Sequence, residues 1–123
     1  MNTGATASVS HQVTDSDTAE ALGSGSVPVL ATPRLLAWCE QATFQALEAT
    51  LDEGITSVGV EVRLDHVAPS PIGRIVRAEA TIEKVKGRRY YFTVSAHDDR
   101  GLIAVGKVVR VAVDEAAFLA KCE

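Results

Sequence analysis

Residues 32–52 have the sequence TPRLLAWCEQATFQALEATLD, and this segment determines the architecture of the chain. Thr32 is a good helix N-cap, and the proline directly after it is favoured because its missing N–H needs no partner at a helix start. Gly54 is typical of the position just past a helix C-terminus, so we predict one long helix over residues 33–52. At 123 residues, the chain has the size of a single domain, residues 1–123, built around this helix.

The helix over residues 33–52 is apolar around most of its circumference. At about 100° per residue, the polar side chains fall on one narrow stripe, which consists of Arg34, Gln41, Gln45, Glu48 and Asp52. A helix of this kind is expected to be covered by a sheet. Glu40 breaks the pattern, because it lies away from the stripe between Leu36 and Phe44. Its carboxylate is directed toward the interior, where an unpaired charge is costly. Glu40 is therefore a functional residue, or one whose side chain extends to the surface or makes a structural hydrogen bond.

The chain changes to a strand pattern after Gly54. Apolar alternation and turn residues predict strands over residues 55–67, 72–86, 88–98 and 102–113. One long helix followed by four strands with tight turns predicts a four-stranded antiparallel sheet wrapped around the helix, an α+β fold. Asp114 is a good cap for a short last helix over residues 114–121. Residues 1–26 are rich in Ser, Thr, Gly and Asp, and a weak alternation around Val9 predicts an N-terminal strand and a short turn there.

His66 ends the apolar side of the first predicted strand. By alternation, one face of this strand carries Val58, Val60, Val62, Leu64 and His66, and the other carries Gly59, Glu61, Arg63 and Asp65. A lone histidine on an apolar face is more often a satisfied core residue than a catalyst. Here, however, the His66 imidazole and the Glu40 carboxylate point into the same interface, which is typical of an active site.

The start of the helix supplies a third candidate, Thr32. Free backbone N–H groups at a helix N-terminus can hold an anion or a developing oxyanion. Thr32 and Glu40 are eight residues apart in the sequence, so their Cα atoms lie about 12 Å apart along the helix and their side chains cannot touch. An imidazole with two hydrogen bonds can bridge most of that distance. A relay from Thr32 through His66 to Glu40 is therefore feasible.

Composition argues against several classes of function. The net charge of -4, with both signs interspersed, is atypical of a nucleic-acid-binding surface. No run approaches the roughly 18 apolar residues of a membrane span, and the N-terminus lacks the basic and apolar regions of a signal peptide. Cys39 and Cys122 form no CxxC pair and are expected to be ordinary thiols of a reducing compartment. We expect a cytoplasmic protein with no metal site and no cofactor.

Four basic residues surround the predicted turn at Gly87, and they are Lys84, Lys86, Arg88 and Arg89. Such a run is usually the solvated tip of a hairpin. It can also attract the phosphates of a nucleotide-containing substrate. The sequence leaves both interpretations open.

Three segments of the chain carry a recognisable combination of residues: Ala31-Thr32-Pro33 through Glu40, Ser57-Val58-Gly59, and His66-Val67-Ala68-Pro69-Ser70-Pro71-Ile72-Gly73. Together they resemble the fluoroacetyl-CoA thioesterase-like family of hotdog proteins. The likeness continues through Gly87-Arg88-Arg89, Ser95-Ala96-His97-Asp98 and Phe118, so it spans residues 27–118. Its most specific part is the threonine and glutamate at a spacing of eight followed by the His-x-Ala-x-x-Pro-x-Gly turn.

The resemblance implies a hotdog fold, in which an antiparallel sheet wraps around a long central helix. It also implies a homodimer or higher homo-oligomer with active sites at the subunit interface and an acyl-CoA substrate, whose coenzyme A is part of the substrate rather than a cofactor. The family's catalytic threonine, glutamate and histidine correspond to Thr32, Glu40 and His66. The family's glycine near the reacting thioester corresponds to Gly59.

The chain also departs from the family pattern. Relatives often carry Gly-x-His-x-Arg in the last strand, whereas Gly106-Lys107-Val108-Val109-Arg110 lacks the histidine. The segment before Thr32 has no aromatic residue to cover a very small acyl group, so selectivity for a fluorinated substrate is not supported. Two alternatives to a thioesterase remain: a non-catalytic hotdog module that binds an acyl thioester or another small ligand, and a hotdog dehydratase or isomerase.

Overall fold

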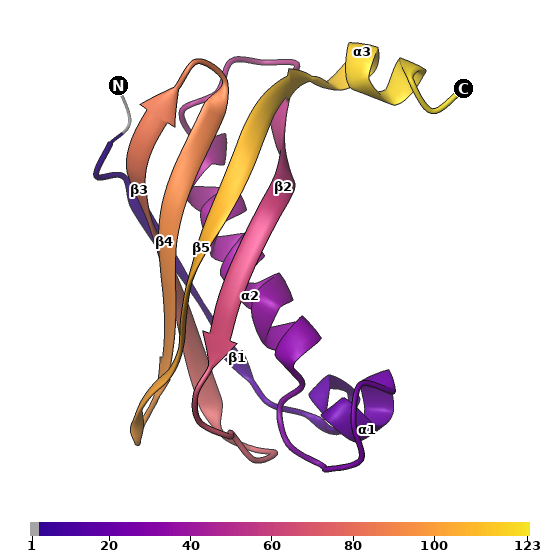
Figure 1. Cartoon of the computed structure of the whole chain (residues 1–123), viewed down its shortest axis with the longest axis vertical. Helices are drawn as coiled ribbons and strands as arrows, with labels where there is room; N and C mark the ends of the chain where they lie inside the picture. The colour runs from indigo at the N-terminus through magenta and orange to yellow at the C-terminus, as the bar shows by residue number, and fades with distance from the viewer. Residues whose placement is uncertain (1–2) are drawn as a thin grey trace.

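The computed structural model describes residues 3–123, in which one curled antiparallel sheet lies against a long helix (Figure 1). The strands are β1 (Thr6–Gln12), β2 (Ile55–His66), β3 (Ile75–Lys86), β4 (Arg89–Asp98) and β5 (Gly101–Asp114). The helices are α1 (Ala19–Leu22), α2 (Thr32–Glu48) and α3 (Glu115–Ala120), with a short 3-10 turn η1 (Asp15–Asp17) before α1. In the sheet the strand order is β1-β3-β4-β5-β2, and every neighbouring pair is antiparallel.

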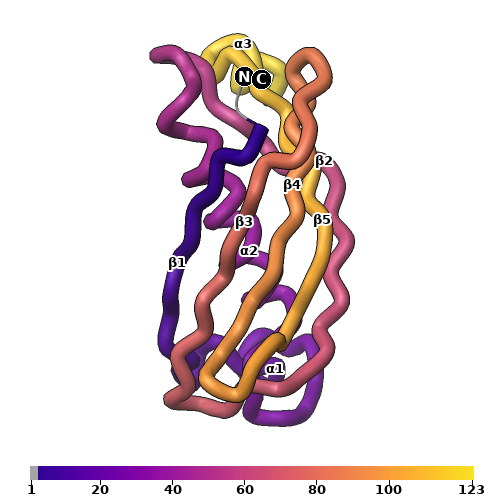
Figure 2. The backbone as a smooth tube through the Cα atoms, turned by 90° about the vertical axis from the view of Figure 1, so that its left-hand side faces the viewer, coloured from indigo at the N-terminus to yellow at the C-terminus, as the bar shows by residue number. Residues whose placement is uncertain are grey.

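The core lies between α2 and the inner face of the sheet, which Figure 2 shows in front of the helix. Buried helix residues recur at helical spacing, and they are Leu35, Trp38, Cys39, Ala42, Ala46 and Leu47. The sheet contributes small and branched residues to the same cluster, chiefly Val76, Ala78, Ala80, Ile82, Phe92, Val94, Ala96 and Val108. The alanines among them leave room for the helix to lie close to the strands. The predicted α+β fold is therefore confirmed.

The helix bounds differ from the prediction at both ends. Ala31 occupies the N-cap position, with φ -75° and ψ 141°, and no side chain caps the helix. Thr32 is the first helical residue, so its predicted role as N-cap is wrong. At the other end α2 stops at Glu48, and the Thr50 hydroxyl donates to the Leu47 carbonyl (2.8 Å), closing the chain into a turn well before residue 52.

The sheet has one strand more than the four predicted over residues 55–113. β1 pairs with β3 along its whole length, from Thr6 opposite Thr81 to Gln12 opposite Ile75. This strand covers the side of α2 that β2 does not reach. The weak alternation around Val9 had indicated it, and the half-buried residues of β1 are Ala7, Val9 and His11. The signal is weak because only two of these three residues are apolar.

A β-bulge interrupts β2 and corrects the predicted alternation. Gly59 pairs with Arg110, and the next pair joins Glu61 to Val109, so Val60 has no partner residue on β5. Residues opposite each other share a face of the sheet, and Arg110 faces α2. Gly59 therefore faces the helix, as His66 does beyond the bulge, and Val58, which pairs with Val111, faces the other way. The predicted faces of Gly59 and Val58 are wrong, whereas those of Val62, Leu64 and His66 are confirmed. One extra residue in the strand is the cause.

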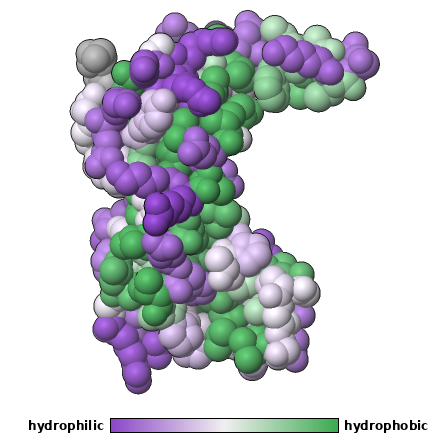
Figure 3. All heavy atoms as spheres, in the orientation of Figure 1, coloured by the Kyte–Doolittle hydropathy of each residue, from purple (hydrophilic) through white to green (hydrophobic). Residues whose placement is uncertain are grey.

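β2 lies at one edge of the sheet, and Val60 and Val62 on it are 49% and 43% exposed. α3 projects from the body near this edge (Figure 1). In the space-filling view the molecule is hollowed between α3 and the opposite end, and apolar residues gather along the hollow (Figure 3). Within residues 3–123, no helix has the length and apolarity needed to cross a membrane.

Candidate active site

Thr32 and His66 meet where the helix begins and β2 ends. Thr32 Oγ1 and His66 Nδ1 are 2.8 Å apart, a hydrogen-bond distance, although the residues are 34 positions apart in the chain. Thr32 is exposed, and His66 is half-buried. His66 Nε2 is buried and has no hydrogen-bond partner among residues 3–123. The structure thus brings together two of the three residues that the sequence analysis selected.

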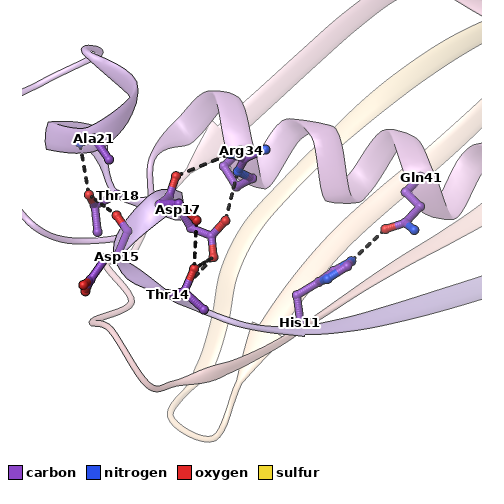
Figure 4. Close-up of polar contacts among 9 residues, drawn as sticks. His11, Thr14, Asp15, Asp17, Thr18, Ala21, Arg34 and Gln41 are labelled. Atoms are coloured by element: carbon purple, nitrogen blue, oxygen red, sulfur yellow. Dashed lines mark hydrogen bonds and ion pairs between the residues drawn. The ribbon is translucent and has the colours of Figure 1, made fainter.

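Asp17 holds the segment that leads into Thr32. The Ala31 N–H donates to the Asp17 carbonyl (2.9 Å). The Asp17 carboxylate lies 3.0 Å from Arg34 Nε, in the first turn of α2, and accepts a hydrogen bond from the Thr14 N–H (2.8 Å; Figure 4). Asp17 therefore fixes the helix start, and with it the direction of the Thr32 hydroxyl.

The loop after His66 lines a pocket beside the Thr32 hydroxyl. The Val67 and Ala68 N–H groups both donate to the Ile103 carbonyl (2.8 and 3.3 Å), which holds this loop on β5. The pocket has a volume of about 390 Å³. Besides Thr32 and His66, its walls are mainly small or apolar, and they include Val27, Val29, Pro33, Val67 and Pro69. An apolar group next to the hydroxyl and the imidazole fits this pocket.

Burial lowers the pKa of His66 below its ordinary value, and the Ala68 backbone opposes this effect to a smaller extent. The imidazole is therefore neutral at neutral pH and has one acceptor nitrogen. When Nδ1 is that acceptor, the Thr32 hydroxyl donates to it and Nε2 carries the proton. This is the arrangement in which an imidazole can take the proton of an attacking hydroxyl.

Glu40 lies on the inner side of β2, away from His66. Its side chain is 37% exposed, and its Oε2 is 3.9 Å from Arg110 Nη1. Its carboxylate lies against Gly59, where a Cβ on residue 59 would collide with it. Within residues 3–123, no hydrogen bond joins Glu40 to His66. The feasible relay from Thr32 through His66 to Glu40 is therefore not formed within one chain.

Arg110 is a part of this site that the sequence analysis did not select. Its side chain is buried, and its Nε and Nη2 donate to the hydroxyl and carbonyl of Ser57 (2.8 and 2.9 Å). Nη1 is 3.4 Å from the Thr43 hydroxyl, and the guanidinium lies over the Phe44 ring at 5.7 Å. Burial lowers the pKa of Arg110, while the Glu40 carboxylate opposes the shift. The available signal was a lone arginine on the apolar side of the last strand.

Gly59 is required where it stands because the Glu40 carboxylate lies across its backbone. A side chain at residue 59 would push that carboxylate away from Arg110. The bulge after Gly59 turns this position toward the helix. Gly59, Glu40 and Arg110 therefore form a second cluster, about two helical turns along α2 from Thr32.

Two other polar features, the basic turn around Gly87 and His11, lie outside the two clusters. The basic turn around Gly87 joins β3 to β4 at the end of the sheet opposite to His66 (Figure 1), with Lys84 Nζ 4.6 Å from the Tyr91 ring centre. His11 stacks on Trp38 (4.7 Å) and lies 2.7 Å from the Gln41 amide oxygen, a structural contact between β1 and α2 (Figure 4).

Within residues 3–123, no group of three His, Cys, Asp or Glu side chains could hold a metal ion. Burial raises the pKa of Cys39 to about 11, so this thiol is not a nucleophile at neutral pH. The pocket beside the helix start is lined by the Thr32 hydroxyl and the His66 imidazole, and Cys39 is not among its lining residues.

A curled five-stranded sheet around one long helix defines a hotdog-fold protein, and here a threonine hydroxyl and an imidazole meet at the helix start. A solved hot-dog-like protein from Thermanaerovibrio acidaminovorans has the same fold, with a TM-score of 0.90 and 26% identity over 98% of this chain and 89% of that chain. The family model of the fluoroacetyl-CoA-specific thioesterases (FlK) matches residues 13–116, and the chain belongs to this family.

Two further comparisons agree with this assignment. The chain is 33% identical over 93 residues to the fluoroacetyl-CoA thioesterase of Streptantibioticus cattleyicolor, a match that covers 76% of this chain and 67% of that protein. A solved structure of the fluoroacetyl-CoA thioesterase FlK superposes with a TM-score of 0.92 and 28% identity over 99% of this chain and 95% of that chain. The family resemblance seen in the sequence is confirmed, and the chain is a thioester hydrolase.

We expect His66 to titrate below the ordinary histidine value of about 6.5, because burial disfavours the charged imidazolium. A lowered pKa in the folded state means that stability is constant above the unfolded value and falls as the pH drops from about 6.5 through the folded pKa. NMR titration of the histidine resonances, with His66 assigned by the His66→Gln variant, measures the pKa of His66 in the folded protein. A His66 resonance that titrates at the same pH in the native protein and in urea would contradict it.

Proposed function

We propose that this chain hydrolyses a small or medium acyl-CoA thioester with Thr32, His66 and Glu40. The 2.8 Å contact between the Thr32 hydroxyl and His66 Nδ1, in a pocket with apolar walls, carries this proposal. The family's substrate, an acyl-CoA, supplies the thioester. The proposed reaction needs no metal and no cofactor other than the coenzyme A of the substrate.

In the proposed reaction Thr32 Oγ1 attacks the thioester carbonyl carbon, or positions a water that does so. His66 accepts the proton of the attacking group. Collapse of the tetrahedral intermediate breaks the carbon–sulfur bond, and His66 returns the proton to the coenzyme A sulfur. If an acyl-Thr32 ester forms, a water then hydrolyses it and regenerates the hydroxyl.

Two sets of backbone N–H groups are suited to the developing oxyanion. The first turn of a helix has N–H groups without intrahelical partners, and in α2 these belong to Thr32 and Arg34 because Pro33 has none. The second is the backbone of Gly59, where the absence of a side chain allows a close approach. Both would act by presenting fixed dipoles to a charge that exists only near the transition state.

Glu40 is better placed as a base for water than as a partner of His66. Its carboxylate is half-exposed and lies 3.9 Å from Arg110, which keeps it beside Gly59 rather than beside the imidazole. A water held between Glu40 and the acyl carbon would be activated for hydrolysis. The alternative, in which Glu40 orients a histidine, requires an imidazole from outside this chain.

A second copy of the chain would complete the site. β2 is an edge strand, and edge strands present unpaired backbone groups that favour pairing with another chain. Val60, Val62 and the half-exposed Glu40 all lie along this side of the molecule. We therefore propose a homodimer or higher homo-oligomer whose interface runs along β2 and brings the two clusters of the site together.

The acyl group is proposed to be small or medium and not selectively fluorinated. The wall of the pocket before the helix is made of Ser24, Gly25, Val27 and Val29, none of them aromatic. The unpaired cysteines, Cys39 and Cys122, fit a cytoplasmic location for the reaction.

The sequence left open a non-catalytic module that binds an acyl thioester without turnover, and a direct assay tests that alternative for this chain. A dehydratase or isomerase is less well supported, because it gives the Thr32–His66 contact no task. Mass analysis after incubation with a panel of acyl-CoA and hydroxyacyl-CoA substrates separates the three. Free acid and free coenzyme A support hydrolysis, loss of water supports a dehydratase, and saturable binding without a product supports the module.

We expect His66→Ala and Glu40→Gln each to lower the rate of coenzyme A release at least ~10²-fold, the scale of acid–base residues. A thiol-reagent assay with short-chain acyl-CoAs measures the rate. Glu48→Gln makes the same chemical change on an exposed position of α2 and serves as the matched control. Wild-type rates in both His66→Ala and Glu40→Gln would overturn the assignment of these residues.

We expect Gly59→Ala to reduce hydrolysis while the fold is retained. The new methyl group displaces the Glu40 carboxylate from Arg110. Because the displaced atoms are the tip of a half-exposed side chain, the free energy of unfolding should change by less than about 1 kcal/mol. Urea denaturation and the coenzyme A release assay measure the two effects, with Val105→Ala on the outer face of the sheet as control. An unchanged rate of coenzyme A release in Gly59→Ala would show that hydrolysis does not depend on the position of the Glu40 carboxylate.

We expect the purified chain to sediment as a homodimer or a larger homo-oligomer. Val62→Lys adds a charge to the β2 edge and should shift sedimentation toward the monomer and lower activity in parallel. Val105→Lys adds the same charge to the opposite face of the sheet and should leave the assembly intact. A monomeric wild-type chain that hydrolyses acyl-CoA at full rate would exclude the proposed interface.

A further inference from the structure

Asp98 is a carboxylate at the end of β4 whose side chain is only 1% exposed. Its Oδ1 accepts a hydrogen bond from the Arg100 N–H (2.8 Å), and its Oδ2 accepts one from the Ser70 hydroxyl (3.0 Å). Arg74 Nη1 lies 3.3 Å from the same Oδ2. Burial by itself would raise the pKa of Asp98, but these hydrogen bonds and the Arg74 charge outweigh it and hold the pKa below its ordinary value.

Ser70 connects this carboxylate to both sides of the candidate site. It is fully buried and lies four residues after His66 in the chain. Its hydroxyl donates to Asp98, while its backbone carbonyl accepts a hydrogen bond from the Leu30 N–H (2.9 Å). Leu30 is two residues before Thr32. Ser70 is thus the residue at which the strand-side loop and the helix-side segment are joined.

These contacts form a closed ring. The chain runs from Thr32 back to Leu30, crosses a hydrogen bond to Ser70, runs back to His66, and returns to Thr32 through the 2.8 Å side-chain contact. A shift of Ser70 therefore changes the position of His66 relative to Thr32. Asp98 is the only residue described here whose side chain holds the Ser70 hydroxyl, and it does so from the sheet.

We propose that Asp98 is a positioning residue, which acts through Ser70 to hold the Thr32 hydroxyl and the His66 imidazole at reacting distance. This inference rests on the proposed function for that pair. Asp98 itself touches neither the thioester nor the attacking group. Its role is to determine the geometry of a contact that forms between two otherwise separate segments.

The neighbouring Asp99 distinguishes this role from that of a general surface charge. Asp99 Oδ1 also pairs with Arg74, at 3.4 Å, but its side chain is 80% exposed and it has no contact with Ser70 among residues 3–123. Asp98→Asn and Asp99→Asn remove the same charge from adjacent positions beside the same arginine. Only Asp98→Asn also leaves one of two hydrogen bonds without an acceptor, because the Ser70 hydroxyl and the Arg100 N–H each use one carboxylate oxygen and the amide has a single oxygen.

We expect Asp98→Asn to lower kcat about tenfold or more, since small displacements of reacting groups are costly. KM for the acyl-CoA should change much less, because Asp98 does not line the pocket beside Thr32. Ser70→Ala should have a similar effect on kcat, and the double variant should lose little more than the larger single variant. Asp99→Asn should keep the wild-type kcat. Circular dichroism and thermal melting show whether each variant is folded at the assay temperature.

A second readout does not depend on activity. The His66 resonance should titrate closer to the ordinary histidine value of about 6.5 in Asp98→Asn and in Ser70→Ala than in wild type, because a loosened loop exposes the imidazole. Asp99→Asn should leave this titration unchanged. If the wild-type protein hydrolyses no thioester, the proposed function fails and this titration still tests the positioning role. Folded Asp98→Asn with wild-type kcat and wild-type His66 titration overturns the positioning role alone.

Discussion

The hydrogen bond between the Thr32 hydroxyl and the His66 imidazole constrains much of the surrounding structure. It joins the first residue of a helix to the last residue of a strand, 34 positions away in the chain. A threonine hydroxyl at a helix start would ordinarily cap backbone N–H groups, a contribution of about 1 kcal/mol. Here Ala31 is in the cap position without a side-chain hydrogen bond, and the hydroxyl is available for His66. The helix therefore lacks the stabilisation of a side-chain cap, and the Thr32 hydroxyl instead connects α2 to the end of β2.

The site divides into two clusters because a helix spaces its residues rigidly. Thr32 and His66 form one cluster at the helix start, and Glu40 with Gly59 and Arg110 forms the other, about two turns further along. Each cluster has its own support: Asp17 and Ser70 hold the first, and the buried Arg110 guanidinium holds the second. Each cluster includes a residue of β2, His66 in the first and Gly59 in the second, so the proposed interface along β2 would bring the two clusters together.

Local patterns were sufficient for part of this arrangement. Thr32 was selected from its position at a helix start, Glu40 from a helical wheel, and His66 from strand alternation, and the α+β fold followed from the order of the elements. The end of α2 could not be predicted, because residues 49–52 are compatible with a helix and only a local turn closes it at Glu48. Arg110 was missed since its partners, Ser57 and Thr43, come from two other elements. A contact between residues of different elements leaves no pattern within any one segment of the sequence.

The bulge at Val60 makes the length of β2 as important as its composition. Before the bulge Gly59 faces the helix, and after it His66 does so as well, although seven positions separate them and a regular strand would place them on opposite faces. Deleting one residue between them would keep every chemical group of the site and still turn one cluster out toward the outer surface of the sheet. Homologous sequences should therefore tolerate substitution at Val60 far more readily than a gap there, so that the spacing between the two positions is inherited as a fixed interval.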